Sequence, residues 1–189
     1  MWALQLTQRP YAEENMFDEG AMFNPVRDLY FQYRTVCLNR KYYGYRLQAI
    51  RGWDKFFEIV IAIGTSSVVG GWSLWHAGIG STIWAVLGGL TALVAVIKPF
   101  LQFSKQVERY TKLFIGYGDT FYDLELLVSE IGRKRNYNDE MEMAYHKTLD
   151  RLKQLAADDD PQPNRKLVLK CTDEVNKEIP MERLWWPER

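Results

Sequence analysis

The chain has 189 residues, carries equal numbers of acidic and basic side chains, and has a pI near 6.7. This length suits one modest domain, or a membrane unit with an appended aqueous part. The neutral charge balance excludes a global field that would attract nucleic acid. Cys37 and Cys171 lie far apart without metal-ligand spacing, so we expect two reduced, buried thiols.

The N-terminal segment, residues 1–24, has no basic region followed by an apolar core. It therefore does not predict a cleavable signal peptide. Asn24 followed by Pro25 is typical of a helix start. Apolar residues then recur seven positions apart and predict one packed face of a long helix: Leu29, Val36, Tyr43, Ile50 and Phe57.

The longest uncharged run, residues 59–97, contains no Asp, Glu, Lys or Arg. It is too long for one membrane crossing of about 20 residues and suits two crossings with a short turn. The segment "GGWSLWHAGIGSTIW" at 70–84 has the glycines of a tight turn and the tryptophans that favour a bilayer interface. The pattern predicts transmembrane helices at about 53–75 and 79–100. A long amphipathic helix of an aqueous bundle is disfavoured, since it would need charges on its outer face.

Basic residues flank the predicted hairpin on both sides, whereas its tip contains only His76. By the positive-inside rule both termini are expected in the cytoplasm, with the hairpin tip facing outward. The expected fold class is an all-α membrane protein. Its two-transmembrane helical hairpin has long helices that continue into a cytosolic helical bundle.

One helical face of the first predicted crossing is a candidate pore face, which would need several subunits to enclose a path. It comprises Glu58, Ala62, Thr65, Val69, Trp72 and His76. Small residues spaced four apart permit close packing between helices. The glycines of these pairs are Gly70, Gly71, Gly88 and Gly89.

Glu58 and Lys98 lie equally far from the hairpin tip, so they are expected at the same depth. A charge near a membrane is costly alone, which predicts a Glu58–Lys98 ion pair at the cytosolic boundary. The alternative is that Glu58 lines the passage. Pro99 removes one backbone hydrogen bond and predicts a kink, which either couples the arms to the membrane helices or is merely tolerated.

Two further apolar series recur every seven residues after the second crossing. They are Phe100, Val107, Phe114, Phe121 and Val128, and Phe103, Tyr110, Tyr117, Leu124 and Ile131. They predict that the second helix continues to residue 131, giving a long helical hairpin over 25–131. The aromatic stripe is interpreted as packed core rather than as a ligand site.

Residues 132–189 are expected to form cytosolic helices at about 139–157 and 165–178, followed by a tail. Asn138 or Asp139 can cap the first of these helices. The second carries three apolar side chains on one face: Val168, Cys171 and Val175.

The tail contains apolar residues that are unfavourable in water, Leu184, Trp185 and Trp186. They are expected to dock on the protein's own bundle or on a neighbouring subunit rather than on an outside partner. The basic run at 133–135 is interpreted as a solvated helix end, with binding of an anionic ligand as the alternative.

No catalytic arrangement is evident in the sequence. The two histidines are too far apart to share a site, and there is no phosphate loop, nucleophile elbow or metal-spaced set. We therefore expect no enzyme activity, no cofactor and no metal.

The chain resembles the SLATT superfamily, bacterial two-transmembrane effectors associated with nucleotide-synthesising or nucleotide-sensing partners. The likeness covers about residues 25–187. It rests on "DLYFQYRTVCLNRKYYGYRLQAIRGWDKFFEIV", the short-tipped hairpin, "FSKQVERYTKLFIGYGDTFYDLELLVSEI" and "LKCTDEVNKEIP". The resemblance implies an antiviral or stress effector that oligomerises and perforates or depolarises the inner membrane when signalled.

The leading hypothesis is thus an oligomeric membrane effector with four or more subunits, since two crossings cannot enclose a pore alone. Its expected partners are the lipid bilayer and either a signalling or sensor protein or a nucleotide messenger. The alternative is a non-conducting two-transmembrane scaffold that recruits or regulates a cytosolic partner. An enzyme acting on lipid is disfavoured by the lack of paired catalytic groups.

Overall fold

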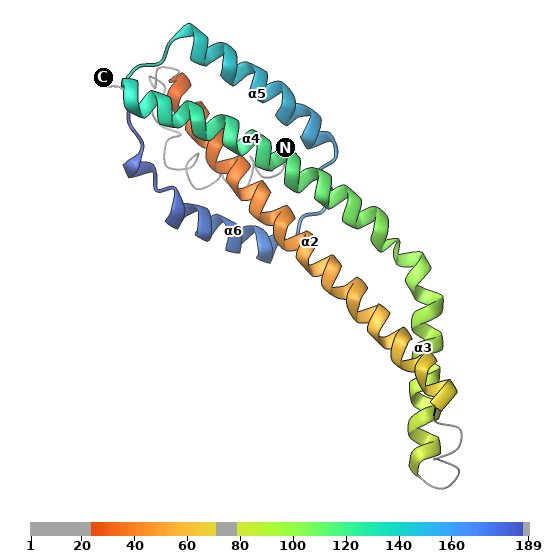
Figure 1. The fold of residues 1–189 in the computed structure, drawn as a ribbon. Coiled ribbons are helices and arrows are strands. Elements are labelled where there is room, and N and C mark those ends of the chain that lie inside the picture. Colours follow the sequence, from red (N-terminus) through yellow and green to blue (C-terminus); the bar gives the residue numbers. More distant parts are fainter. Residues whose placement is uncertain (1–23, 71–78, 187–189) are drawn as a thin grey trace. The chain divides into compact units, whose positions relative to one another are not determined.

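The computed structural model describes residues 24–70 and 79–186, and of residues 65–70, 79–85 and 87 only the backbone. Five α-helices occur in these ranges: α2 (Pro25–Gly70), α3 (Ile79–Leu101), α4 (Phe103–Lys134), α5 (Asp139–Ala157) and α6 (Arg165–Glu178). A short 3-10 helix, η1 (Met181–Arg183), follows them (Figure 1). The chain forms two compact units. Unit 1 contains the described residues up to Tyr45 and from Thr111 onward, and unit 2 is Arg46–Tyr110.

The predicted fold class of a two-transmembrane hairpin is wrong. In the part of the chain that the structure describes, no helix is long and apolar enough to cross a membrane. The first predicted crossing, 53–75, includes Asp54, Lys55 and Glu58, and charges of this kind are costly in a bilayer. The second, 79–100, includes Lys98 and Pro99 near its end, and residues 71–78 of the predicted turn segment 70–84 lie outside the described residues.

The second helix is not continuous as predicted. It divides into α3 and α4 at Gln102, which has a left-handed φ of 46°. Pro99 lies inside the last turn of α3 and has no N–H to donate to the preceding turn, which weakens the helix there. Gln106 lies in the first turn of α4 and makes two hydrogen bonds across the break. Its side-chain amide donates to the Leu101 carbonyl at 2.9 Å, and its backbone N–H donates to the Gln102 carbonyl at 3.2 Å.

Unit 1 has a core rich in tyrosine. Members of the predicted seven-residue series on α2 and α4 are buried in it. Tyr33 of α2 stacks on Phe121 of α4 at 5.1 Å, and Tyr43 stacks on Tyr117 at 5.6 Å. The other fully buried large side chains here include Leu29, Leu38, Leu113, Leu124 and Ile131. The aromatic stripe of this unit is therefore packed core, as predicted.

Side-chain caps fix the starts of α5 and α6. The Asn138 side chain accepts a hydrogen bond from the Met141 N–H at 3.0 Å, and Asn164 accepts one from the Leu167 N–H at 3.2 Å. Both caps satisfy donors that the first turn of a helix leaves unpaired. The bounds of α5 and α6 coincide with the two predicted helices.

Buried apolar faces hold α5 and α6 in unit 1. Met141 and Tyr145 of α5 are buried, and so are Val168, Cys171 and Val175 of α6. Close approach of α5 to α4 depends on Gly116, because a Cβ there would lie 2.4 Å from Leu155 Cδ2.

Candidate functional site

Large apolar side chains are exposed throughout the described part of unit 2. Their exposed fractions range from 40% at Ile97 to 80% at Phe100. They come from both helices: Trp53, Phe56, Ile59 and Ile63 from α2, and Val86, Leu90, Leu93, Val96, Ile97 and Phe100 from α3. Together they expose apolar area on the order of 1,000 Å², whereas the largest patch of a typical monomer is about 300–600 Å². This apolar surface of unit 2 is the first candidate site.

The exposed side of α3 has a large-residue face and a small-residue face. At 100° per residue, the exposed large side chains fall on one arc and the exposed Gly88, Ala92 and Ala95 on the neighbouring arc. The two arcs together cover roughly 220° of the helix circumference. Val94, which is 7% exposed, lies on the remaining arc.

A charged cluster lies among these exposed apolar side chains. The Lys98 ammonium is 3.3 Å from Glu58 Oε1 and 3.3 Å from Asp54 Oδ1. Glu58 and Lys98 are therefore together in the structure, and their role at a membrane boundary stays a prediction. Sequence reasoning missed Asp54, although its position one helical turn before Glu58 was a usable signal.

The other residues of the candidate pore face are only partly described. Ala62 is exposed on α2, and Thr65 and Val69 are described by backbone alone. Trp72 and His76 lie outside the described residues. The face is thus untested as a group.

The glycines proposed for helix packing do not pack within this chain where the structure describes them. A Cβ at Gly88 or Gly89 would meet nothing within 4 Å. Gly70 is described by backbone only, and Gly71 lies outside the described residues. The close approach of α2 to α3 instead occurs at Gly64, where a Cβ would lie 2.1 Å from Thr91 Oγ1.

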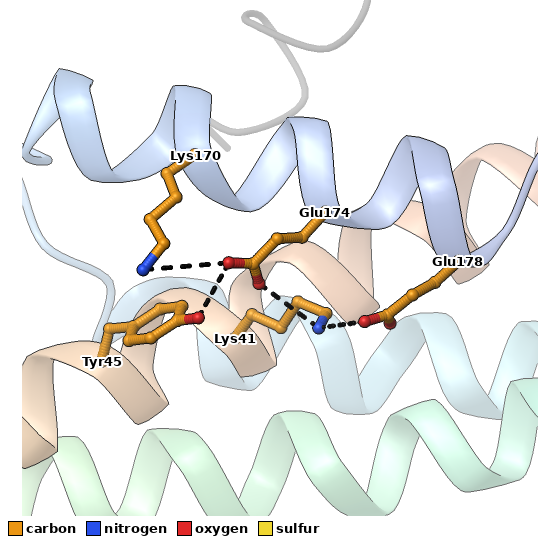
Figure 2. A network of polar contacts seen from close by, with 5 residues as sticks. All are labelled: Lys41, Tyr45, Lys170, Glu174 and Glu178. Atoms are coloured by element: carbon orange, nitrogen blue, oxygen red, sulfur yellow. Dashed lines mark hydrogen bonds and ion pairs between the residues drawn. The ribbon is translucent and has the colours of Figure 1, made fainter.

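A second candidate site is the polar network between α2 and α6 (Figure 2). Glu174 accepts a hydrogen bond from Tyr45 at 2.8 Å and pairs with Lys41 at 3.5 Å and Lys170 at 3.9 Å. Lys41 also pairs with Glu178 at 2.7 Å. The hydrogen bond from Tyr45, followed by the one from Lys41, lowers the pKa of the Glu174 carboxyl. This α2–α6 network joins α6 to α2 through charged and hydrogen-bonded side chains.

Buried tyrosines hold the linker between α5 and α6. Asp159 Oδ1 accepts hydrogen bonds from the Tyr43 and Tyr117 hydroxyls, both at 2.8 Å. Asp160 accepts one from Tyr42 at 3.1 Å and donates its backbone N–H to Tyr43 Oη at 3.0 Å. Burial raises the pKa values of Tyr43 and Tyr117, so both hydroxyls stay protonated as donors. The hydrogen bonds of this tyrosine–aspartate cluster hold the linker against α2 and α4.

The predicted tail contacts are made on unit 1 of the same chain. The Tyr30 hydroxyl donates to the Trp185 carbonyl at 2.8 Å, and the Tyr30 ring meets the Trp186 ring edge-on at 5.3 Å. Trp186 Nε1 donates to the Met181 carbonyl at 3.3 Å. Leu184, Trp185 and Trp186 are all half-buried.

Neither cysteine is arranged for chemistry. Both are free and buried, and burial raises the pKa of each thiol to about 11. Across residues 24–70 and 79–186, no group of His, Cys, Asp and Glu side chains is placed to hold a metal ion.

No protein-family model, curated protein or solved structure gives a significant match to this chain.

Proposed function

We propose that the protein is a self-assembling membrane effector that makes a lipid bilayer leaky. The apolar surface of unit 2 embeds in lipid, and unit 1 remains in water and receives the trigger. The observation that carries this proposal is that ten large apolar side chains are exposed among the described side chains of unit 2. The resemblance to the SLATT superfamily supports a role in bacterial antiviral defence.

The size of the apolar surface favours an apolar environment over water. Covering about 1,000 Å² of apolar area is worth on the order of 25 kcal/mol before the costs of association. Stability of a whole domain is only about 5–15 kcal/mol. Leaving such a surface in water is therefore a heavy penalty for this fold.

The shape of the exposed surface favours lipid as its main cover. A second protein copy would cover one arc of α3, whereas roughly 220° of its circumference is exposed. Protein–protein interfaces are also only about 56–65% apolar. Between Ile59 and Ile97 the sequence offers no charged side chain to such an interface. Lipid tails meet both conditions, since they can cover a wide apolar arc of a helix and need no polar partner.

The small-residue face of α3 suits assembly of several copies. Gly88, Ala92 and Ala95 are exposed, and short side chains let helix backbones approach closely in lipid. Assembly along this face would leave the large-residue face toward lipid. Disturbance of the bilayer then depends on the number of assembled copies.

Vesicles of phosphatidylethanolamine and phosphatidylglycerol test the proposal. We expect the full chain to float with the vesicles and to release a trapped dye. The double variant Leu93→Glu/Val96→Glu should lose at least tenfold in both readouts, because two charges enter the lipid-facing surface. The matched control is Ile115→Glu/Leu126→Glu, which places charges at exposed apolar positions of unit 1 and should behave as wild type.

The scaffold alternative gives a different pattern. Wild type would then stay with the aqueous fraction or bind without dye release. Charges at Leu93 and Val96 would change the subunit count, measured by light scattering, and leave vesicles unaffected. Either result would refute the membrane-effector proposal.

A further inference from the structure

A cavity of about 550 Å³ lies in unit 1, well away in sequence from the apolar surface of unit 2. The first turn of α2 forms one wall, and the turn between α4 and α5 supplies Arg135, Asn136 and Tyr137. Trp185 of the tail completes it. The volume falls within the usual 300–1,000 Å³ of small-molecule sites.

The Asn24 side chain at this cavity accepts hydrogen bonds from the Val26 and Arg27 N–H groups, whereas three other polar side chains there have no protein partner. The Tyr137 hydroxyl is buried and makes no hydrogen bond. Burial raises the pKa of Tyr137 to about 12, so the hydroxyl is a proton donor at neutral pH. Within the described ranges, the side chains of Arg135 and Asn136 have no hydrogen bond or ion pair either. The buried hydroxyls of Tyr42 and Tyr43 are paired, which sets Tyr137 apart.

An aromatic surface lines the same cavity. The backbone of Trp185 is held by the hydrogen bond that its carbonyl accepts from the Tyr30 hydroxyl. Tyr30 packs on the ring of Trp186 instead, and among the described side chains no ring contacts Trp185. The Trp185 indole is thus free to stack on a ligand.

The basic side chain of the cavity is anchored through its backbone. Arg135 has a left-handed φ of 49°, and its N–H donates to the Ile131 carbonyl at 2.8 Å. Asp28 is a carboxylate near Tyr137, and it accepts a hydrogen bond from the Tyr145 hydroxyl at 2.6 Å. Asp28 does not line the cavity, and among the residues that do, Arg135 is positively charged and none is negatively charged.

We infer that this cavity binds a small aromatic anion, with its charged group at Arg135 and Tyr137 and its ring on Trp185. A guanidinium and a phenol offer adjacent donors to a planar or tetrahedral anion. The indole supplies the apolar contact that a simple inorganic anion cannot use. This inference does not rest on the proposed membrane function.

Calorimetric titration of the full chain in detergent micelles tests the inference, with phenyl phosphate as the probe. We expect saturable binding of phenyl phosphate, and at least tenfold weaker binding of both inorganic phosphate and phenol. Arg135→Gln should weaken phenyl phosphate at least tenfold, or about 1.4 kcal/mol. Tyr137→Phe should weaken it at least threefold. Arg133→Gln removes an equal charge two residues away, outside the cavity, and should change binding less than twofold.

Three results would overturn the inference. If phenyl phosphate does not bind, the inferred binding site is refuted. Equal binding of inorganic phosphate, or equal losses in Arg133→Gln and Arg135→Gln, shows only surface attraction of anions. Unchanged binding in Tyr137→Phe, with the fold intact by circular dichroism, refutes the role of the buried hydroxyl.

Discussion

Replacement of Asp159 by alanine should destabilise unit 1 strongly. The side chain accepts two hydrogen bonds of 2.8 Å, from Tyr43 and Tyr117, whose residues are almost fully buried. Asp159→Ala leaves both hydroxyls without this acceptor, and each buried unsatisfied group costs about 1–3 kcal/mol. Tyr43 keeps its bond from the Asp160 N–H, so the lower part of the range applies to it.

The expected loss of unfolding free energy is about 2–4 kcal/mol, which lowers Tm by roughly 4–16 °C for a chain of this size. The neighbouring Asp158→Ala is the matched control. Asp158 pairs with Lys112 at 2.7 Å, and both side chains are well exposed, so its loss should cost at most about 1 kcal/mol.

Urea unfolding followed by near-ultraviolet circular dichroism measures both variants. This signal comes from packed tyrosine and tryptophan side chains, and every described tyrosine except Tyr110 belongs to unit 1. Equal losses in Asp159→Ala and Asp158→Ala, within about 0.5 kcal/mol, would refute the idea that the buried hydroxyls depend on Asp159.

Three further changes test other contacts. Gly64→Ala should destabilise unit 2 by about 1–3 kcal/mol in thermal unfolding, because its Cβ would lie 2.1 Å from Thr91 Oγ1. The pKa of Glu174 is lowered, mainly by the Tyr45 hydrogen bond, so its stabilising effect is present above its unfolded pKa. That effect should disappear as pH falls through the lower folded pKa, and Glu174→Gln should flatten this part of a stability–pH profile. Cys171, with a raised pKa of about 11, should resist iodoacetamide at pH 8 until the protein is denatured.

Each of these changes has its own check. Gly52→Ala is the control for Gly64→Ala, since a Cβ at Gly52 meets nothing within 4 Å, and equal destabilisation would contradict the packing argument. If Glu174→Gln loses stability at low pH as much as wild type does, other carboxyl groups cause the loss. Fast alkylation of Cys171 in the folded protein would show that α6 opens readily.

Local signals in the sequence predict unit 1 well. Asn138 and Asn164 precede helices whose bounds match the prediction, because caps and apolar spacing are encoded within a few residues. The seven-residue series also predicts burial of Tyr43 and Tyr117. It does not reveal that their hydroxyls meet Asp159, since that contact depends on the path of a linker more than 40 residues away.

Contacts between distant segments account for most of what the sequence did not predict. The cavity at Arg135 combines residues from three places in the chain, and only the basic run gave a weak signal. Pro99 predicts a kink in one continuous helix. The structure instead has a helix break three residues later, at Gln102. The uncharged block at 59–97 predicts two membrane crossings, but no described helix is long and apolar enough to cross a membrane.

The proposed function requires contact between the apolar surface of unit 2 and lipid. A spin label on Leu93→Cys, in a background with both native cysteines replaced by alanine, tests it in vesicles by electron paramagnetic resonance. We predict that this label collides more often with oxygen, which concentrates in lipid, than with a water-soluble nickel complex. A label on Leu126→Cys in unit 1 should show the opposite preference. Access of nickel to the label at residue 93 would place the surface in water, and shielding from both reagents would place it in a protein interface. Either result would contradict the claim.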